Sequence, residues 1–449
     1  MKKVILIAFY FNQVNEIASK RLRALAKYLP QFGWEPIVIV PDLGFIPKEN
    51  DDLNCRIIFT EYEDMFSHFT NKFKKSKSTD FTDYNDSKDS IEFNDEKLKD
   101  STSYSNPIAS KAISMAGEVF AFPDGMKYWH ESAFEEASKL IEEEEIDAII
   151  SSSWPITCHT IAKDLNEKYN LPWIADLRDL WNLNPYVSHT FIRNYFEKRL
   201  ELKTFENADA LTTTTDLAAK TLSTLHPDSR IVPILSGYDK DDFKFLEELI
   251  AENDDSMNNS PNDSSKLKFI YAGSLYGGKR DPSYLFEAIR QLEDDNKLDS
   301  SKISIEFYGD STGLEEIAKR NGLSDIVHIG GKIAHEEVLK KQLNSDVLLL
   351  ISWDNEKEKM FIPGKIYEYF ALKKPVLSIG YKEGSLKDLI DETKVGYHVS
   401  SLESTKEALL DIYNEFTEKG TVELRSDINI EDYSMENMAK KFADLLNEL

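Results

Sequence analysis

The sequence predicts an α/β protein with two doubly wound domains, each built around a parallel sheet. Three observations lead to this expectation. The chain has 449 residues, more than a single hydrophobic core usually accommodates. Apolar runs typical of buried strands alternate with amphipathic stretches of helical period, and they do so in both halves. Strands that alternate with helices pair in parallel, because each crossover helix returns the chain to the end of the sheet at which the previous strand began.

The first half shows this alternation from its first residues. Residues 2–11, KKVILIAFYF, are predicted to form a buried strand, and residues 15–29 place apolar side chains near one face of a helix. Gly33 is expected to end that helix. The other elements expected here are strands over 35–40, 147–153, 172–177, 209–215 and 230–235, with helices over 191–207 and from Asp216.

A second unit of the same kind follows the first. Its expected helices include Leu285–Leu292, and a last amphipathic helix covers residues 435–449. We expect an N-terminal domain over 1–235, a C-terminal domain over 236–430, and a return of residues 431–449 to the first domain. The expected strands of the second unit are 267–273, 303–309, 326–331, 346–352, 375–380 and 395–400.

A polar, charged stretch interrupts the pattern at residues 72–105. Its scarcity of aliphatic side chains predicts a long mobile insertion that is simply solvated. A lid over an acceptor substrate is the functional alternative. Residues 253–266 form a second polar loop.

The charge and cysteine content exclude several classes of protein. Acidic residues outnumber basic ones by 80 to 54, for a net charge of −26, which argues against nucleic acid as a partner. Cys55 and Cys158 lie far apart without metal-ligand spacing, as is typical of the reducing cytoplasm.

The apolar run at the N-terminus is too short for a signal peptide, and we interpret it as a strand. No stretch has the apolar length needed to cross a bilayer, so we expect any membrane contact to be peripheral.

The stretch YAGSLYGGKRDP, Tyr271–Pro282, has the features of an anion site. A strand ends at Gly273, glycines follow, and Lys279 and Arg280 stand directly before a helix. Glycines allow backbone N–H groups to approach an anion, and the start of a helix is electropositive. Asp281 is the expected N-cap. A tight surface turn with exposed cations is the alternative interpretation.

Two further strands also end in glycine. FYGDS contains Gly309, and in IGGKIAHEE the pair Lys332 and Ile333 precedes a helix that begins at His335. The backbone near Lys332 and Ile333 is suited to frame a flat base. Taken singly, each of these segments is an ordinary strand–helix turn.

The stretch FIPGKIYEYFALKKPVLSIG carries a lysine and a glutamate at the start of a helix. Lys365 and Glu368 are three residues apart and therefore lie on one face. A carboxylate facing a cleft suits the two hydroxyls of a ribose, while the N–H groups of Gly364 and Lys365 suit a phosphate. A surface Lys–Glu pair is the alternative, while Ile366 and Phe370 are expected to pack inward.

The order of these segments resembles glycosyltransferase family 4, the retaining nucleotide-sugar transferases with the GT-B fold. The matching segments in the second half are GSLYGGKR, YGD, GGKIAHEE, SDVLLLIS and PGKIYEYFALKKPVLSIG. In the first half they are ASKRLRALAKYLPQFGWEPIVIV, LPWIADLRDLW and ILSGYDKDDF. The resemblance implies two Rossmann-like domains that face each other across a cleft.

The resemblance also implies roles for individual residues. Glu368 is expected to bind the donor ribose, and Lys279 and Arg280 to stabilise the departing diphosphate as the catalytic cations. The other residues expected on the donor side are Gly273, Ser274, Gly309, Lys332, Ile333, Pro363, Gly364 and Lys365. Enzymes of this kind are generally thought to need no protein nucleophile, metal or cofactor, because the donor, here expected to be UDP- or GDP-linked, is itself the substrate.

The chain departs from the family pattern at two places. The family often carries a second glutamate at the position of Met360, and here Glu358 is nearby but out of register. The glycine-rich turn after the first strand is replaced by FYFNQVNE. The missing carboxylate bears on how the transferred sugar is held.

Acceptor-side residues are expected in the first half, and the candidates are Arg21, Trp129, Arg178 and Asp179. A structural Arg178–Asp179 pair is an equal alternative. His159 lies within a helical run and is expected to be packed rather than catalytic. The run Asp239-Lys240-Asp241 imitates a metal-binding motif, but we expect a surface turn.

The sequence therefore predicts transfer of a sugar to a glycan or lipid-diphosphate-linked acceptor in the synthesis of cell-surface polysaccharide. The alternatives are a protein that binds nucleotide sugars without catalysis and an isomerase of the UDP-sugar 2-epimerase kind. Lys20, Arg23 and Lys27 form a basic helical face that we expect to be solvated; contact with an anionic membrane is the alternative.

Overall fold

A computed structural model describes residues 1–13, 17–44, 53, 55–63, 122–187, 189–244, 266–425 and 429–449. The chain divides into two compact units: residues 1–22 with 35–209, and residues 23–34 with 210–449. The expected insertion at 72–105 and nearly all of the polar loop at 253–266 lie outside the described residues. The domain boundary near residue 235 stays a prediction.

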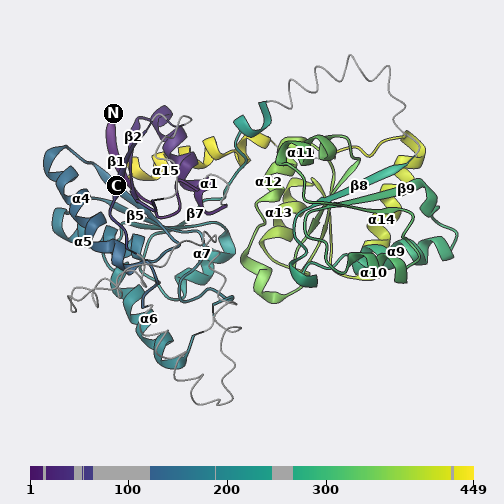
Figure 1. The fold of residues 1–449 in the computed structure, drawn as a ribbon, viewed down its shortest axis with the longest axis horizontal. Helices are drawn as coiled ribbons and strands as arrows, with labels where there is room; N and C mark the ends of the chain where they lie inside the picture. Colours follow the sequence, from purple (N-terminus) through teal and green to yellow (C-terminus); the bar gives the residue numbers. More distant parts are fainter. Residues whose placement is uncertain are drawn as a thin grey trace, which may run out of the picture. The chain divides into compact units, whose positions relative to one another are not determined.

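The first half of the chain contributes a seven-stranded sheet in the order β3-β2-β1-β4-β5-β6-β7 (Figure 1). The register of β1 with β4, β2 with β3, β4 with β5 and β6 with β7 is parallel. The strands are β1 (Lys2–Ile7), β2 (Trp34–Pro41), β3 (Arg56–Thr60), β4 (Ala148–Ser152), β5 (Trp173–Leu177), β6 (Ala210–Thr213) and β7 (Ile231–Pro233). The helices are α1 (Ile17–Tyr28), α4 (His130–Glu143), α5 (Thr157–Tyr169), α6 (Phe191–Thr204) and α7 (Asp216–Ser223).

The second half contributes a six-stranded parallel sheet in the order β10-β9-β8-β11-β12-β13. Its strands are β8 (Leu267–Ala272), β9 (Ile303–Tyr308), β10 (Val327–Gly331), β11 (Val347–Ile351), β12 (Val376–Ile379) and β13 (Gly396–Val399). Its helices are α9 (Ser283–Asp294), α10 (Leu314–Arg320), α11 (His335–Leu343), α12 (Lys365–Leu372), α13 (Ser385–Thr393) and α14 (Leu402–Lys419). The last helix is α15 (Met435–Asn447).

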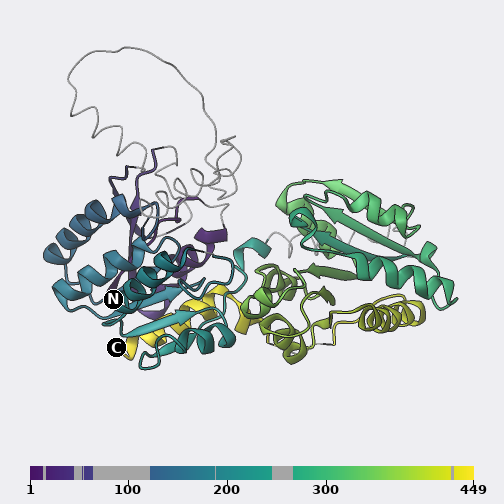
Figure 2. The ribbon, with the colours of Figure 1, turned by 90° about the horizontal axis from the view of Figure 1, so that it is seen from below.

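The central strands β11 and β12 of this second sheet are buried on both faces, which explains why β11 is apolar throughout, whereas the edge strand β10 is largely exposed. Successive residues point to opposite faces: Phe269 and Leu349 join one hydrophobic cluster, whereas Ile270 and Leu348 join another. Helices α9, α10 and α14 cover the first face, and α11, α12 and α13 cover the second (Figures 1 and 2).

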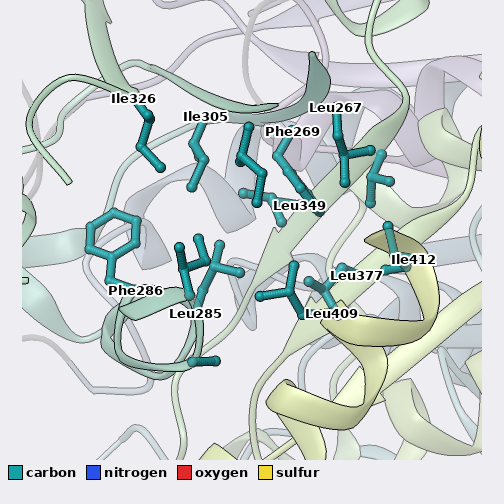
Figure 3. Close-up of a cluster of buried hydrophobic side chains, with 14 of the residues drawn as sticks. Leu267, Phe269, Leu285, Phe286, Ile305, Ile326, Leu349, Leu377, Leu409 and Ile412 are labelled. Carbon is teal, nitrogen blue, oxygen red and sulfur yellow. The ribbon is translucent and has the colours of Figure 1, made fainter. Parts of the chain in front are cut away.

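The first of these clusters shows how the sheet and its helices are held together (Figure 3). Leu409 from α14 lies beside Leu377 of β12, and Phe286 from α9 packs edge-on against Phe307 of β9. Each fully buried side chain of this size contributes about 1.5–3 kcal/mol. The carboxyl ends of the strands, with the turns that carry the candidate residues, are therefore anchored to a rigid layer.

Several local predictions can be compared with the observed elements. Gly33 ends the first helical segment in the left-handed conformation with φ 88°. Ile366 and Phe370 are buried as expected. The N-cap of α9 is Pro282 instead of Asp281. The expectation was wrong by one residue, but the Asp281 carboxylate still accepts a hydrogen bond from the N–H of Ser283 at 2.9 Å.

Candidate functional site

A pocket of about 320 Å³ opens at the carboxyl ends of β8, β9 and β10, beside the first turn of α12. Ligands of open α/β sheets bind at this edge. The pocket is lined by Ala272, Gly273, Tyr308, Gly309, Lys332, Ile333, His335, Val338, Gln342, Lys365 and Glu368. Six of the residues assigned to the donor side from the sequence thus meet in one cavity: Gly273, Gly309, Lys332, Ile333, Lys365 and Glu368.

Two glycines allow the strand ends to pack closely at the pocket floor. Gly273 has φ 148° and Gly309 has φ 112°, values that side chains rarely tolerate. A Cβ atom on Gly309 would lie 2.4 Å from the carbonyl oxygen of Gly273, and one on Gly273 would lie 1.9 Å from Lys365 Nζ. The Gly273 N–H donates to the Tyr308 carbonyl at 2.7 Å, and the Gly309 N–H donates to the Gly331 carbonyl at 2.7 Å. The glycines therefore make room for the lysine.

Lys365 brings a partly desolvated cation to this floor. Its ammonium donates to the carbonyl oxygen of Ala272 and lies 4.8 Å from the centre of the Tyr271 ring. Burial and, to a smaller extent, the positive charge of Arg280 lower the pKa of Lys365 from its ordinary 10.5 to about 8, with Glu368 acting in the opposite direction. The charged lysine is thus less stable here than in water, and an anion placed beside it would be attracted strongly.

Arg280 lies near the hydroxyl of the same tyrosine. One of its terminal nitrogens is 3.5 Å from both the Tyr271 hydroxyl and the Ser274 carbonyl oxygen, and its guanidinium lies 4.5 Å from the Tyr276 ring centre. Arg280 and Glu368 both act on the pKa of Lys365. The three charged groups therefore form one electrostatic cluster.

Tyr271 was missed by the sequence reasoning. It lies in an apolar strand and is buried, and its hydroxyl donates to the Ser274 carbonyl oxygen at 2.9 Å. Burial raises the pKa of Tyr271, so it remains a neutral phenol near the cations of Lys365 and Arg280. Its position two residues before Gly273, on the opposite side of the strand from Ala272, was the available signal.

Lys279 does not line this pocket. Its ammonium lies 5.4 Å from the ring centre of Trp353, at the rim of a second pocket of about 270 Å³. That pocket is also lined by Asp281, Asp354 and Gly380. Lys279 thus lines a different hollow from Lys365, and its chain neighbour Arg280 is not among the residues that line either of these two pockets.

The remaining donor-side residues lie around the first pocket. Ser274 Oγ bonds the Asp310 carboxylate at 3.3 Å and accepts the Tyr276 N–H at 3.0 Å. Gly364 is the N-cap of α12. Pro363 borders a small separate hollow together with Glu358.

The residues expected on the acceptor side are engaged within the first unit. Arg21 is buried and forms a two-pronged ion pair with Asp176, with nitrogen–oxygen distances of 3.0 and 3.1 Å. Arg178 donates to the carbonyl oxygens of Ala18 and, at 2.8 Å, of Ser153. Burial lowers the pKa of Arg178. Asp176, the partner of Arg21, was not among the residues singled out from the sequence.

The other two acceptor-side candidates are also shielded. Trp129 is fully buried, and its indole N–H donates to Thr60 Oγ1 at 2.7 Å. Burial raises the pKa of Asp179. The polar groups of Arg21, Arg178 and Trp129 thus form hydrogen bonds within the protein, whereas Asp179 is partly buried.

Two motifs are structural, as expected. His159 is fully buried, and its Nδ1 lies 2.7 Å from Ser151 Oγ. Asp239 and Asp241 both pair with Lys27, at 2.7 and 2.5 Å.

Within the described ranges, no three His, Cys, Asp or Glu side chains are grouped as a metal site. The described helices include none with the length and apolarity to traverse a bilayer.

Comparisons with known proteins gave matches among solved structures. Sucrose-phosphate synthase from Thermosynechococcus elongatus is 15% identical, with a TM-score of 0.57 over 100% of this chain and 99% of that chain. A glycosyltransferase from Rickettsia africae ESF-5 is 15% identical, with a TM-score of 0.58 over 100% and 98%. Anabaena Alr3699/HepE in complex with UDP-glucose is 12% identical, with a TM-score of 0.53 over 100% and 100%.

No family model matched the chain, and the search of curated proteins also found no match. At identities this low, the likeness shows the fold alone. It confirms the predicted GT-B fold class, with two parallel α/β sheets.

Proposed function

We propose that this protein is a glycosyltransferase that takes a sugar from a nucleotide-sugar donor bound at the six-stranded sheet. The observation that carries the proposal is the pocket in which Lys365, Glu368 and Lys332 converge on a glycine-lined floor. Such a pocket combines the cationic, carboxylate and backbone groups that can contact a nucleoside diphosphate.

Each part of the donor has a matching group. The diphosphate would lie against the ammonium of Lys365 and the start of α12, with Arg280 adding positive charge from beside Tyr271. Glu368 would accept hydrogen bonds from the ribose hydroxyls. The backbone beside Lys332 and Ile333 would frame the base. This assignment keeps the expected UDP- or GDP-linked donor and requires no further cofactor.

The reaction would follow from this placement. The bond between the sugar and the diphosphate breaks, the acceptor oxygen bonds to the same carbon, and its proton passes to a diphosphate oxygen. We propose the retaining course that the resemblance to family 4 implies. The cations then lower the barrier by stabilising negative charge on the leaving group. Removing one such cation should lower the rate on the order of 10²-fold or more.

The acceptor side of the proposal extends the same reasoning. We propose a glycan or lipid-diphosphate acceptor in cell-surface polysaccharide synthesis, with Arg21, Trp129, Arg178 and Asp179 shaping its site from within. We expect the enzyme to act in the cytoplasm, the compartment that its two separated cysteines indicate.

A thermal-shift screen of UDP-, GDP-, ADP- and TDP-sugars tests the donor half. A true donor should stabilise the fold by roughly 3 kcal/mol at a concentration 100-fold above its Kd. Glu368→Gln should reduce this stabilisation. Glu337→Gln is the matched control, because Glu337 is an exposed carboxylate in the first turn of α11 and does not line the pocket. Absence of any stabilising nucleotide sugar would refute the proposal.

A non-catalytic role in nucleotide-sugar binding is the second candidate, because Met360 replaces the expected carboxylate. The two functions differ in turnover. Release of free nucleoside diphosphate only when a glycan acceptor is present would establish transfer. Donor binding without release, against every acceptor tried, would establish the binding role.

A further inference from the structure

Helix α6 presents an exposed face of aromatic and aliphatic side chains in the first unit. Phe191 is 86% exposed, Ile192 59%, Phe196 55% and Tyr195 52%. Leu202 on the same helix is also exposed, as are Tyr186 and Val187 just before it. Soluble proteins rarely expose several large apolar residues side by side without a partner for them.

The charged residues of α6 are sorted by sign. Lys198, Arg199 and Lys203 are exposed. Both glutamates of the helix are buried: Glu197 accepts from Arg193 Nε at 2.7 Å, and Glu201 accepts the Asn182 N–H at 2.9 Å. The exposed charge on the helix is therefore basic, although the whole chain carries a net charge of −26.

The apolar and basic side chains lie on the same side of the helix. At 3.6 residues per turn, residues 191, 192, 195, 196, 198, 199, 202 and 203 fall within an arc of roughly 160°. The buried carboxylates lie on the opposite side. The Arg199 guanidinium is 5.8 Å from the Tyr195 ring centre, so cation and ring form one surface.

We propose that this face of α6 binds the surface of a membrane that contains anionic lipids. Aromatic rings and aliphatic chains of this exposure insert at the boundary between headgroups and acyl chains, while Lys and Arg reach anionic headgroups. Two chains that each carry a net charge of −26 repel each other, which disfavours a second copy as the partner. The basic side chains of this face can reach anionic headgroups at close range, where the rest of the chain's charge is screened.

This surface replaces the one suggested by the sequence. On α1, the ammonium of Lys27 already pairs with Asp239 and Asp241. The inference about α6 does not depend on the proposed transferase activity, since lipid binding can be measured without donor or acceptor.

Vesicle flotation of the full chain tests the inference. One set of vesicles is pure phosphatidylcholine, and in the other set phosphatidylglycerol replaces a third of it. We expect binding to the second set only, and weaker binding at high salt because exposed charges are screened. Failure of the unmodified chain to bind the anionic vesicles would overturn the proposal.

Two double variants separate the apolar and the charged contributions. Phe191→Ser with Phe196→Ser should weaken binding by about 100-fold, because each phenyl ring buried in the membrane contributes about tenfold. Lys198→Glu with Lys203→Glu should weaken it by at least about tenfold as well, since each basic residue near an anionic surface contributes roughly fivefold.

The matched control carries the same charge reversal on α10. Lys319→Glu with Arg320→Glu changes two exposed basic residues in the other unit and should leave binding unchanged. All variants alter exposed side chains, so the melting temperature and the donor-induced shift should be kept. Equal vesicle binding by all three variants would overturn the proposal. The proposal would also be overturned if the unmodified chain formed a dimer but did not bind vesicles, and if the Phe191→Ser, Phe196→Ser variant no longer formed that dimer.

Discussion

The lowered pKa of Lys365 predicts that donor affinity depends on pH. Burial and the charge of Arg280 lower this pKa from 10.5 to about 8. The lowering corresponds to about 3 kcal/mol against the ammonium form in the empty site, at about 1.4 kcal/mol per pKa unit. A bound diphosphate would offset this penalty, so binding should raise the pKa of Lys365 toward its ordinary value.

The direction of the pH effect follows from this linkage. Below pH 8 the lysine is protonated in both the free and the bound states, and affinity is constant with respect to this group. Above pH 8 the free protein loses the proton that the bound state keeps, so affinity should fall up to about tenfold per pH unit. If the donor restored the ordinary pKa completely, the total loss would approach roughly 300-fold.

Isothermal titration calorimetry with the nucleotide sugar found in the screen measures this dependence from about pH 7 to about pH 10. Lys365→Arg should flatten the profile, because a guanidinium stays protonated throughout. Arg280→Gln should move the midpoint upward, since it removes a charge that lowers the pKa of Lys365. A constant Kd in the unmodified protein, or the same profile in Lys365→Arg, would refute the reasoning.

Two further predictions concern the stability of the fold. Gly309→Ala should destabilise the protein by about 3 kcal/mol or more, because its Cβ would lie 2.4 Å from the Gly273 carbonyl oxygen. Gly313→Ala, with positive φ but open space around its Cβ, should cost only about 1 kcal/mol; equal losses in chemical denaturation would contradict the steric explanation. Arg21→Met should cost about 3–5 kcal/mol by leaving Asp176 charged and buried without its ion-pair partner, and a loss below about 1 kcal/mol would show that the pair contributes no more than a surface pair.

Much of the donor-side pocket could be predicted from the sequence because its features are local. A glycine at the end of an apolar strand is visible in the chain, and so is a helix that begins directly after Pro363-Gly364. Parallel pairing then brings the carboxyl ends of the strands to one edge. Gly273, Gly309, Lys332 and Lys365 accordingly line the same cavity.

The acceptor-side residues could not be interpreted in the same way. Arg21 and Asp176 are 155 positions apart in the chain. No local sequence pattern indicates that the Asp176 carboxylate will form an ion pair with the Arg21 guanidinium. Trp129 likewise gave no sign in the sequence that Thr60 would satisfy its indole N–H. Burial and pairing over such separations depend on the completed sheet and the helices packed on it.

The amino-acid order alone determined the alternation of strands and helices and the glycine turns at the strand ends. It also determined the spacing that puts Lys365 and Glu368 on one helical face. Each of these features depends on backbone preferences and on residues close together in the chain. Only the tertiary structure decided that Tyr271 lies near both Lys365 and Arg280, and that Lys279 lies near Trp353. It also decided that α6 buries its carboxylates while its aromatic rings are exposed. Those outcomes depend on which groups lose water when the sheets and helices pack, and that desolvation is a property of the whole fold.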